Sequence, residues 1–116
     1  EEGEIIGTSH MKSNNDGILI KISGMAPNDQ YAPRAVEERN PLAWPGLAKE
    51  EDLAGLPPGV ISVDECDPLR DEGVNFYRLL LRAKVRVRCV MQMGVIHGGH
   101  LLGSSAVPEL TFSTAR

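Results

Sequence analysis

The chain has 116 residues, enough for one domain, with 41% hydrophobic and 24% charged residues, as in ordinary globular proteins. A net charge of -4 without a dominant basic stripe argues against a nucleic-acid or anionic-membrane partner, and no apolar run is long enough for a membrane span. The two cysteines, Cys66 and Cys89, form neither a disulfide framework nor a Cys-x-x-Cys pair. We therefore expect a reduced, cytoplasmic setting.

The first part of the chain, residues 1–45, alternates short apolar pieces with Asn, Asp, Gly and Pro. Within it, "GILIKIS" is compatible with a short strand or one helical turn, and "PNDQYAP" has turn chemistry. Trp44, in "PLAWPG", is predicted to anchor packing. A short helix is then predicted to begin near Ala48, with acidic residues in its first turn and a Pro-Pro stop after it.

The second part, residues 46–116, has the clearest secondary-structure pattern. "GVISVD" (59–64) is rich in β-branched residues and predicts a strand. "RDEGVNFYRLLLRAK" (70–84) has helical periodicity, and "VRVRCVMQM" (85–93) alternates as a strand does, with its arginines on one face. "GVIHGGH" predicts a glycine-rich loop, and the residues after it predict a weak helix or an irregular tail.

The predicted order strand, helix, strand fixes the expected fold class. A crossover helix between two strands implies an α/β fold with parallel strands. We assign Met91 and Met93 to the strand core. We assign the apolar stripe of the helix to five residues: Val74, Tyr77, Leu80, Leu81 and Ala83.

Chemistry-bearing residues follow both predicted strands. The run "SVDECDPLRDEG" places five carboxylates between the last residue of the first strand and the start of the helix, and His97 and His100 lie in the loop after the second strand. Functional groups in such sheets lie at the carboxyl ends of the strands, so a carboxylate and an imidazole should meet at one edge. A carboxylate that accepts the Nδ1 proton of a histidine leaves its other ring nitrogen free to act as a general base toward a hydroxyl nucleophile.

Three segments together resemble one protein family: "NPLAWP", "GLPPGVISVDECDPLRDEGVNFYRLLLRA" and "MGVIHGGH". They are similar to the C-terminal part of an α/β-hydrolase of the hormone-sensitive-lipase-like carboxylesterase group. The resemblance implies that Asp67 is the catalytic acid and His97 the catalytic histidine of a Ser-His-Asp triad. It implies a cap-proximal region or loop over residues 1–45, and a C-terminal β-α-β part over residues 46–116. It also implies hydrolysis of short-to-medium acyl esters, a small-molecule ester substrate, no cofactor and no metal.

The chain departs from the family pattern in one respect that bears on activity. The family uses a Gly-x-Ser-x-Gly nucleophile elbow, and this sequence contains none. Ser104 and Ser105 follow the histidine and lack the second glycine. We therefore expect a partial hydrolase, either a truncated product or one chain of a split protein. It would be inactive alone and would need the N-terminal half as a partner; a homo-oligomer stays open.

Other interpretations stay open for the same residues. Asp67 is also a suitable turn or helix-cap residue, and Asp64 and Glu65 are expected to be solvated loop charges. His97 could be a surface loop histidine, and His100 could replace it in the triad if the loop were shifted. Two histidines astride two glycines are a weak signal for a metal site. A non-catalytic α/β-hydrolase-like binding or interaction module is the alternative to an enzyme.

Overall fold

The computed structural model describes residues 32, 34, 37–102, 107–109 and 111 of the chain. The expectations for residues 1–31 and for Ser104 and Ser105 lie outside these described residues. The elements, in chain order, are η1 (Pro45–Leu47), α3 (Glu50–Leu53), β1 (Gly59–Asp64), α4 (Arg70–Arg82), β2 (Val87–Gln92) and α5 (Gly99–Leu102).

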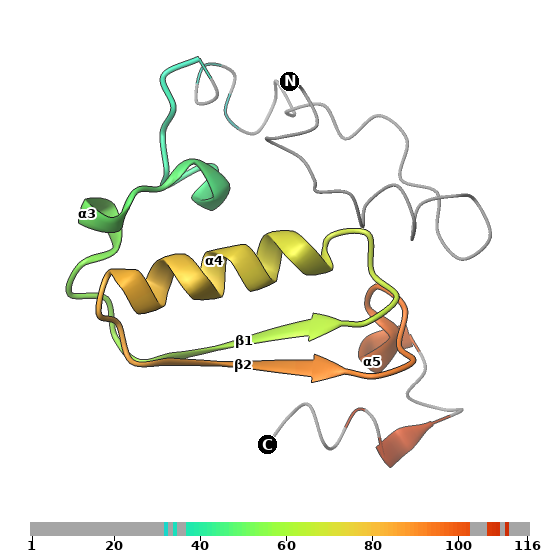
Figure 1. Cartoon of the computed structure of the whole chain (residues 1–116). Helices are drawn as coiled ribbons and strands as arrows, with labels where there is room; N and C mark the ends of the chain where they lie inside the picture. Colours follow the sequence, from blue (N-terminus) through green and yellow to red (C-terminus); the bar gives the residue numbers. More distant parts are fainter. Residues whose placement is uncertain (1–31, 33, 35–36, 103–106, 110, 112–116) are drawn as a thin grey trace.

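The two strands pair in parallel, with α4 as the crossover between them. The register runs from Gly59 opposite Val87 to Asp64 opposite Gln92. Figure 1 shows α4 along one face of the pair, and both strands pointing toward the same edge, where α5 lies. The predicted α/β class, its parallel strands and its crossover helix are confirmed. The loops after β1 and after β2 therefore leave the sheet at the same edge, as expected for parallel strands.

A small hydrophobic core lies between α4, α3 and the sheet. Its fully buried residues are Leu53, Leu80 and Val85. Around them pack Ala48, Ile61, Phe76, Leu79, Ala83 and Val87. The assignment of Leu81 to the apolar stripe is wrong, because its side chain is 46% exposed. Phe76 and Leu79 pack against the core instead. The sheet-facing line of the helix passes through positions 73, 76, 80 and 83, and Leu79 lies beside this line, three residues after Phe76.

Gly73 is where α4 approaches the sheet most closely. A Cβ atom at this position would lie 2.6 Å from Cγ1 of Val63 and 3.7 Å from Cγ2 of Ile61. The missing side chain therefore lets the first turns of the helix rest directly on β1. This contact fixes the short loop that connects the strand to the helix and that carries the acidic cluster.

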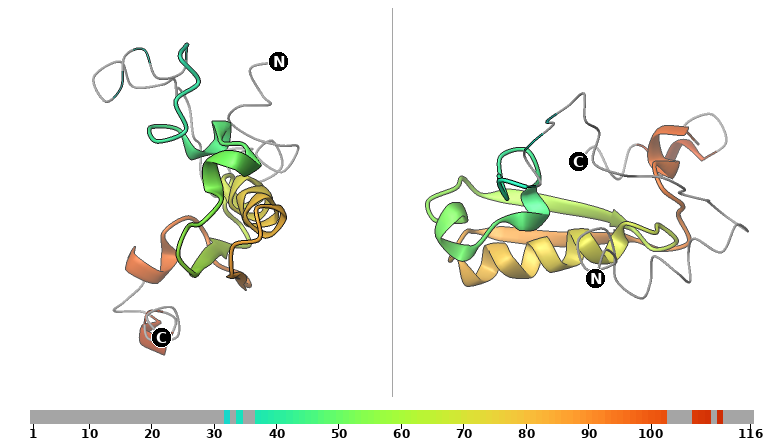
Figure 2. Two further views of the ribbon diagram at one scale, coloured as in Figure 1. Left: turned by 90° about the vertical axis from the view of Figure 1, so that its left-hand side faces the viewer. Right: turned by 90° about the horizontal axis from the view of Figure 1, so that it is seen from above.

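A short helical segment links the region before β1 to α4. The helix predicted near Ala48 begins at Glu50, and the backbone N–H of Lys49 donates to Oδ2 of Asp52 at 2.8 Å. Arg82, in the last turn of α4, pairs with Glu50 at 2.7 Å. Figure 2 shows these elements on the same side of the sheet as α4. Together with α4, they form the helical layer over that side of the sheet.

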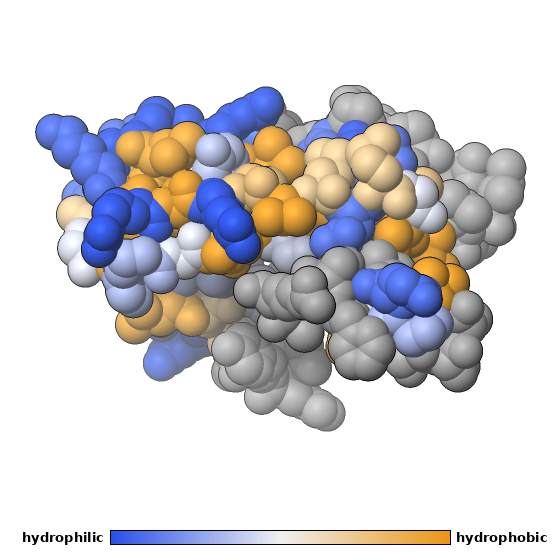
Figure 3. Space-filling view, turned by 90° about the horizontal axis from the view of Figure 1, so that it is seen from below, coloured by the Kyte–Doolittle hydropathy of each residue, from blue (hydrophilic) through white to orange (hydrophobic). Residues whose placement is uncertain are grey.

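The opposite face of the sheet is more exposed. Ile61 and Val63 point toward α4, so alternation directs Val60 to the other face, where it is 54% exposed. Arg88 lies opposite Val60 in the register and is exposed too. Figure 3 views this side and shows apolar and charged surface intermixed. Two described strands cannot cover both of their own faces, so the face away from α4 stays open over the described residues.

The assignment of Met91 and Met93 to the strand core is wrong. Their exposed fractions are 40% and 69%. Met91 is the second-to-last residue of β2, and Met93 lies beyond the strand end. The thiols of Cys66 and Cys89 are free, and burial raises the pKa of the Cys89 thiol. Over the described residues, no helix has both the length and the apolar character needed to cross a bilayer.

Candidate active site

Asp67 occupies a tight turn between β1 and α4. Its backbone N–H donates to the carbonyl of Asp64 at 3.2 Å, and its own carbonyl accepts from the amide of Arg70 at 3.1 Å. One carboxylate oxygen, Oδ1, accepts from the amide of Leu69 at 2.8 Å. The next residue, Pro68, is among the most deeply buried side chains. The turn role considered for Asp67 is therefore present, and it uses one of its two oxygens.

The second oxygen of Asp67 faces His97. Oδ2 lies 2.8 Å from Nδ1 of the imidazole, and the acid is nearly buried while the ring is 54% exposed. An ionised carboxylate can only accept hydrogen bonds, so the contact favours the tautomer with its proton on Nδ1. The other ring nitrogen, Nε2, is then left as a proton acceptor. Two strand-end loops thus bring together the two residues singled out in the sequence.

Three further contacts join the same two loops. The amide of Gly94 donates to Oε2 of Glu65 at 2.7 Å, and the amide of Cys66 donates to the carbonyl of Val95 at 2.9 Å. Oδ2 of Asp64 accepts from the amide of Gly98 at 3.1 Å. The expectation of solvated charges is wrong for Asp64, which is only 5% exposed. Carboxylates therefore hold the histidine loop against the end of β1.

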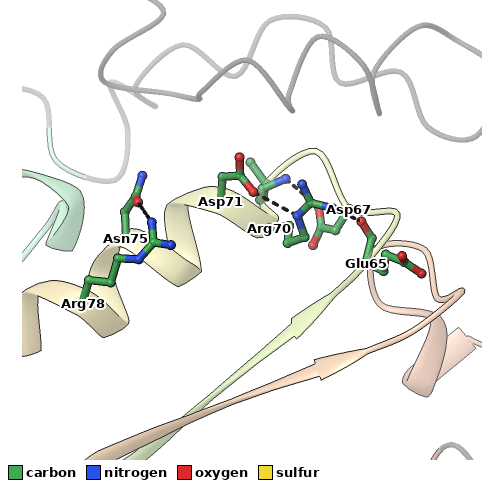
Figure 4. A network of polar contacts seen from close by, with 7 residues as sticks. Glu65, Asp67, Arg70, Asp71, Asn75 and Arg78 are labelled. Atoms are coloured by element: carbon green, nitrogen blue, oxygen red, sulfur yellow. Dashed lines mark hydrogen bonds and ion pairs between the residues drawn. The ribbon is translucent and has the colours of Figure 1, made fainter. Parts of the chain in front are cut away.

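Arg70 braces the acidic loop, and the sequence analysis did not single it out. Its Nη1 donates to the carbonyl of Glu65 at 3.0 Å, and its Nε donates to Oδ1 of Asp71 at 2.9 Å. Figure 4 shows this side chain lying between the two residues. A cation in the first turn of a helix is disfavoured by the helix dipole, which makes Arg70 an anomaly that could have pointed to a loop partner.

His100 does not replace His97 beside Asp67. Its Nδ1 lies 3.8 Å from Oδ2 of Asp64, beyond hydrogen-bond range. The two histidines therefore face different carboxylates. In the part of the chain that the structure describes, no three His, Cys, Asp or Glu side chains are grouped as metal ligands would be.

Glu72 lies in the first turn of α4, as the sequence predicts. Burial raises its pKa above the ordinary value. Its Oε1 would lie 3.1 Å from a Cβ added at Gly46, so the carboxylate faces η1. Trp44, directly before η1, is half-buried, which agrees with a packing role. These contacts support the entry to α4 rather than the Asp67–His97 pair.

The chemistry available to this arrangement follows from its geometry. A carboxylate and an imidazole exposed to solvent form two of the three parts of a nucleophilic relay. The relatives of the chain indicate which kind of protein carries this carboxylate and imidazole. The family model described as the alpha/beta hydrolase fold matches residues 5–101.

The chain belongs to the alpha/beta hydrolase family. It is 30% identical to Esterase LipI of Mycobacterium tuberculosis over 106 residues, which is 91% of this chain and 33% of that esterase. The structure of esterase Est22 with p-nitrophenol has a TM-score of 0.82 and 50% identity, over 92% of this chain and 31% of Est22. The expected resemblance to esterases of the α/β-hydrolase family is confirmed.

A second structural relative connects the chain with the lipase group expected from the motifs. Brefeldin A esterase, described as a bacterial homologue of human hormone-sensitive lipase, has a TM-score of 0.70 and 42% identity. The match covers 76% of this chain and 24% of that hydrolase. The chain thus spans about a third or less of the length of these relatives.

Proposed function

We propose that this chain is the C-terminal portion of a serine carboxylesterase or lipase-like hydrolase, and that it supplies the acid and the base of the Ser-His-Asp triad. The observation that carries the proposal is the 2.8 Å contact between Oδ2 of Asp67 and Nδ1 of His97. It joins the loops after two parallel strands, where α/β proteins hold their functional groups. The esterase relatives support the same reaction class.

The proposed mechanism is acyl transfer in two steps. His97 takes the proton from a serine hydroxyl through Nε2 while the oxygen attacks the ester carbonyl. The imidazolium, stabilised by Asp67, then returns the proton to the leaving alcohol, and an acyl-serine remains. In the second step the same imidazole activates water, which attacks the acyl group and releases the carboxylic acid and the free serine. Neither step requires a cofactor or a metal.

The serine belongs to an N-terminal portion, which this proposal makes the principal partner. This part would join the open face and edge of the two-stranded sheet. We propose short-to-medium acyl esters as substrates, as the resemblance to the esterase group implies. Without the partner, this chain should hydrolyse no ester, because loss of one triad member costs up to about 10⁶-fold in kcat.

Co-expression with a matching N-terminal portion of a related esterase tests the function. The portion must carry the nucleophilic serine, and the assay is hydrolysis of p-nitrophenyl esters of increasing acyl length. We expect turnover from the assembled pair, fastest for short or medium chains, and none from either part alone. Failure of an assembled pair to turn over any ester would contradict the proposal.

A non-catalytic binding module is the second candidate. The absence of a Gly-x-Ser-x-Gly sequence from the 116 residues favours it. It predicts that the assembled pair binds an ester analogue, such as a phosphonate, without turnover and without covalent labelling. Covalent labelling of the partner's serine only in the presence of this chain would exclude it.

A further inference from the structure

Asp64 is a buried carboxylate at the carboxyl end of β1. Its exposed fraction is 5%, so its charge is largely removed from water. Burial of a carboxylate is costly unless hydrogen-bond donors compensate it. The donor within range is the backbone N–H of Gly98, 3.1 Å from Oδ2, and the Nδ1 of His100 lies farther away, at 3.8 Å.

Asp64 contacts both sides of the Asp67–His97 pair. Its backbone carbonyl accepts from the amide of Asp67 at 3.2 Å, on the acid side. Its side chain accepts from Gly98, the residue directly after His97, on the imidazole side. One residue anchored in a strand therefore holds the backbone on both sides of the 2.8 Å contact.

Gly98, which donates to Asp64, has a backbone conformation that favours glycine. Its φ is +67°, in the left-handed region, although a Cβ there would meet no atom within 4 Å. Backbone conformation, rather than lack of space, thus favours glycine at this position. The amide of Gly99 donates to the carbonyl of Ile96 at 2.8 Å, which closes a tight turn around His97. Movement of the Gly98 amide would therefore move His97 with it.

We propose that Asp64 is a positioning residue: its carboxylate holds the turn that carries His97, and so keeps the imidazole at hydrogen-bond distance from Asp67. This inference deepens the proposed esterase function and rests on it for its effect on catalysis. Asp64 does not touch the substrate. Its loss lets the turn shift, and a displacement of about 1 Å in a catalytic group can lower kcat by about 100-fold.

The first test measures the imidazole of His97 in the full 116-residue chain. Long-range ¹H–¹⁵N spectra of the histidine-labelled chain report which ring nitrogen carries the proton. The parent should show the tautomer protonated on Nδ1, and Asp64→Ala should shift it toward Nε2. Asp64→Asn keeps an oxygen acceptor for Gly98 and should retain the parent tautomer.

The second test measures kcat and KM of the assembled pair with a p-nitrophenyl ester. Asp64→Ala should lower kcat about 10- to 100-fold while KM changes little, because only the orientation of the base is affected. Asp64→Asn should recover most of the lost kcat. Asp52→Ala is the matched control: it removes a similar carboxylate-to-amide bond, to Lys49, away from the site and should leave kcat at the parent value.

The outcomes separate this inference from the proposed function. A folded Asp64→Ala variant that keeps the parent tautomer at His97 would overturn the positioning role. If Asp64→Ala does not give the parent circular dichroism spectrum, Asp64→Ser replaces it, since its shorter side chain cannot reach Gly98. If the assembled parent hydrolyses no ester, the proposed function fails, and the tautomer of His97 still decides the role of Asp64.

Discussion

The close approach of α4 to β1 predicts that Gly73→Ala weakens the helix, although alanine is the better helix former. A Cβ atom would lie 2.6 Å from Cγ1 of Val63, about 1 Å inside ordinary carbon–carbon contact. Val63 is buried in a paired strand, so it has little freedom to withdraw. The added methyl group must therefore push the helix away from the sheet.

Two opposing effects set the magnitude of the destabilisation caused by Gly73→Ala. Overpacking costs about 1–3 kcal/mol, and replacing a helical glycine by alanine contributes about 1 kcal/mol in the other direction. The net destabilisation is then about 1 kcal/mol, which corresponds to about five-fold faster amide hydrogen exchange in α4.

Hydrogen exchange measured by mass spectrometry on a peptide covering residues 70–82 is the assay. Asn75→Ala is the control, because Asn75 is exposed on the same helix and gains helix propensity without a clash. The double variant Gly73→Ala, Val63→Ala should be less destabilised than the sum of the two single changes by about 1 kcal/mol. Slower exchange in Gly73→Ala, as in the control, would refute the close packing of α4 on β1.

Three further predictions concern charges and the open sheet. Burial raises the pKa of Glu72 above its ordinary value of 4.5. Protonation of Glu72 therefore stabilises the fold fully at pH values below 4.5, and this stabilisation is lost as the pH rises through the raised pKa. Glu72→Gln should therefore be more stable than the parent at neutral pH. The ratio of the amide exchange rates of variant and parent, measured at the same pH, should approach one in acid. A stability difference that stays constant with pH would contradict this prediction. Arg70→Ala should speed amide exchange in the loop after β1 by at least ten-fold, since charged hydrogen bonds contribute about 1.5–3 kcal/mol. Arg78→Ala is the control and should not speed exchange in that loop, because Arg78 is exposed and its hydrogen bond is to Asn75. Addition of the N-terminal portion should slow exchange in both β1 and β2, because it covers exposed sheet surface; unchanged rates would argue against that partner.

The local pattern of the sequence was sufficient for the main elements and their order. β-branched residues predicted β1 at residues 59–64, and helical periodicity predicted a helix that begins at Arg70. The crossover between two strands required their parallel pairing, which in turn placed both following loops at one edge. The meeting of Asp67 and His97 follows from that topology and from the family resemblance, while their catalytic roles stay a prediction.

Other features depend on contacts that a linear pattern does not contain. The predicted apolar stripe wrongly included Leu81, because several faces of α4 carry apolar residues. Only the contact of Gly73 with β1 identifies the face that packs on the sheet. Met91 alternates as a core residue does, but its burial depends on neighbours beyond the two described strands. The brace formed by Arg70 joins a side chain to a backbone carbonyl five residues earlier, and no residue pattern specifies such a bond.

The most direct test of the account is the kcat of the assembled pair carrying Asp67→Asn, His97→Ala or both. If the two residues act as one relay, Asp67→Asn lowers kcat about 10⁴-fold, His97→Ala lowers it about 10⁶-fold, and the double variant is no worse than His97→Ala. Near-parent turnover in either single variant, or losses that multiply in the double variant, would show that the pair does not act as the acid and base of this hydrolase.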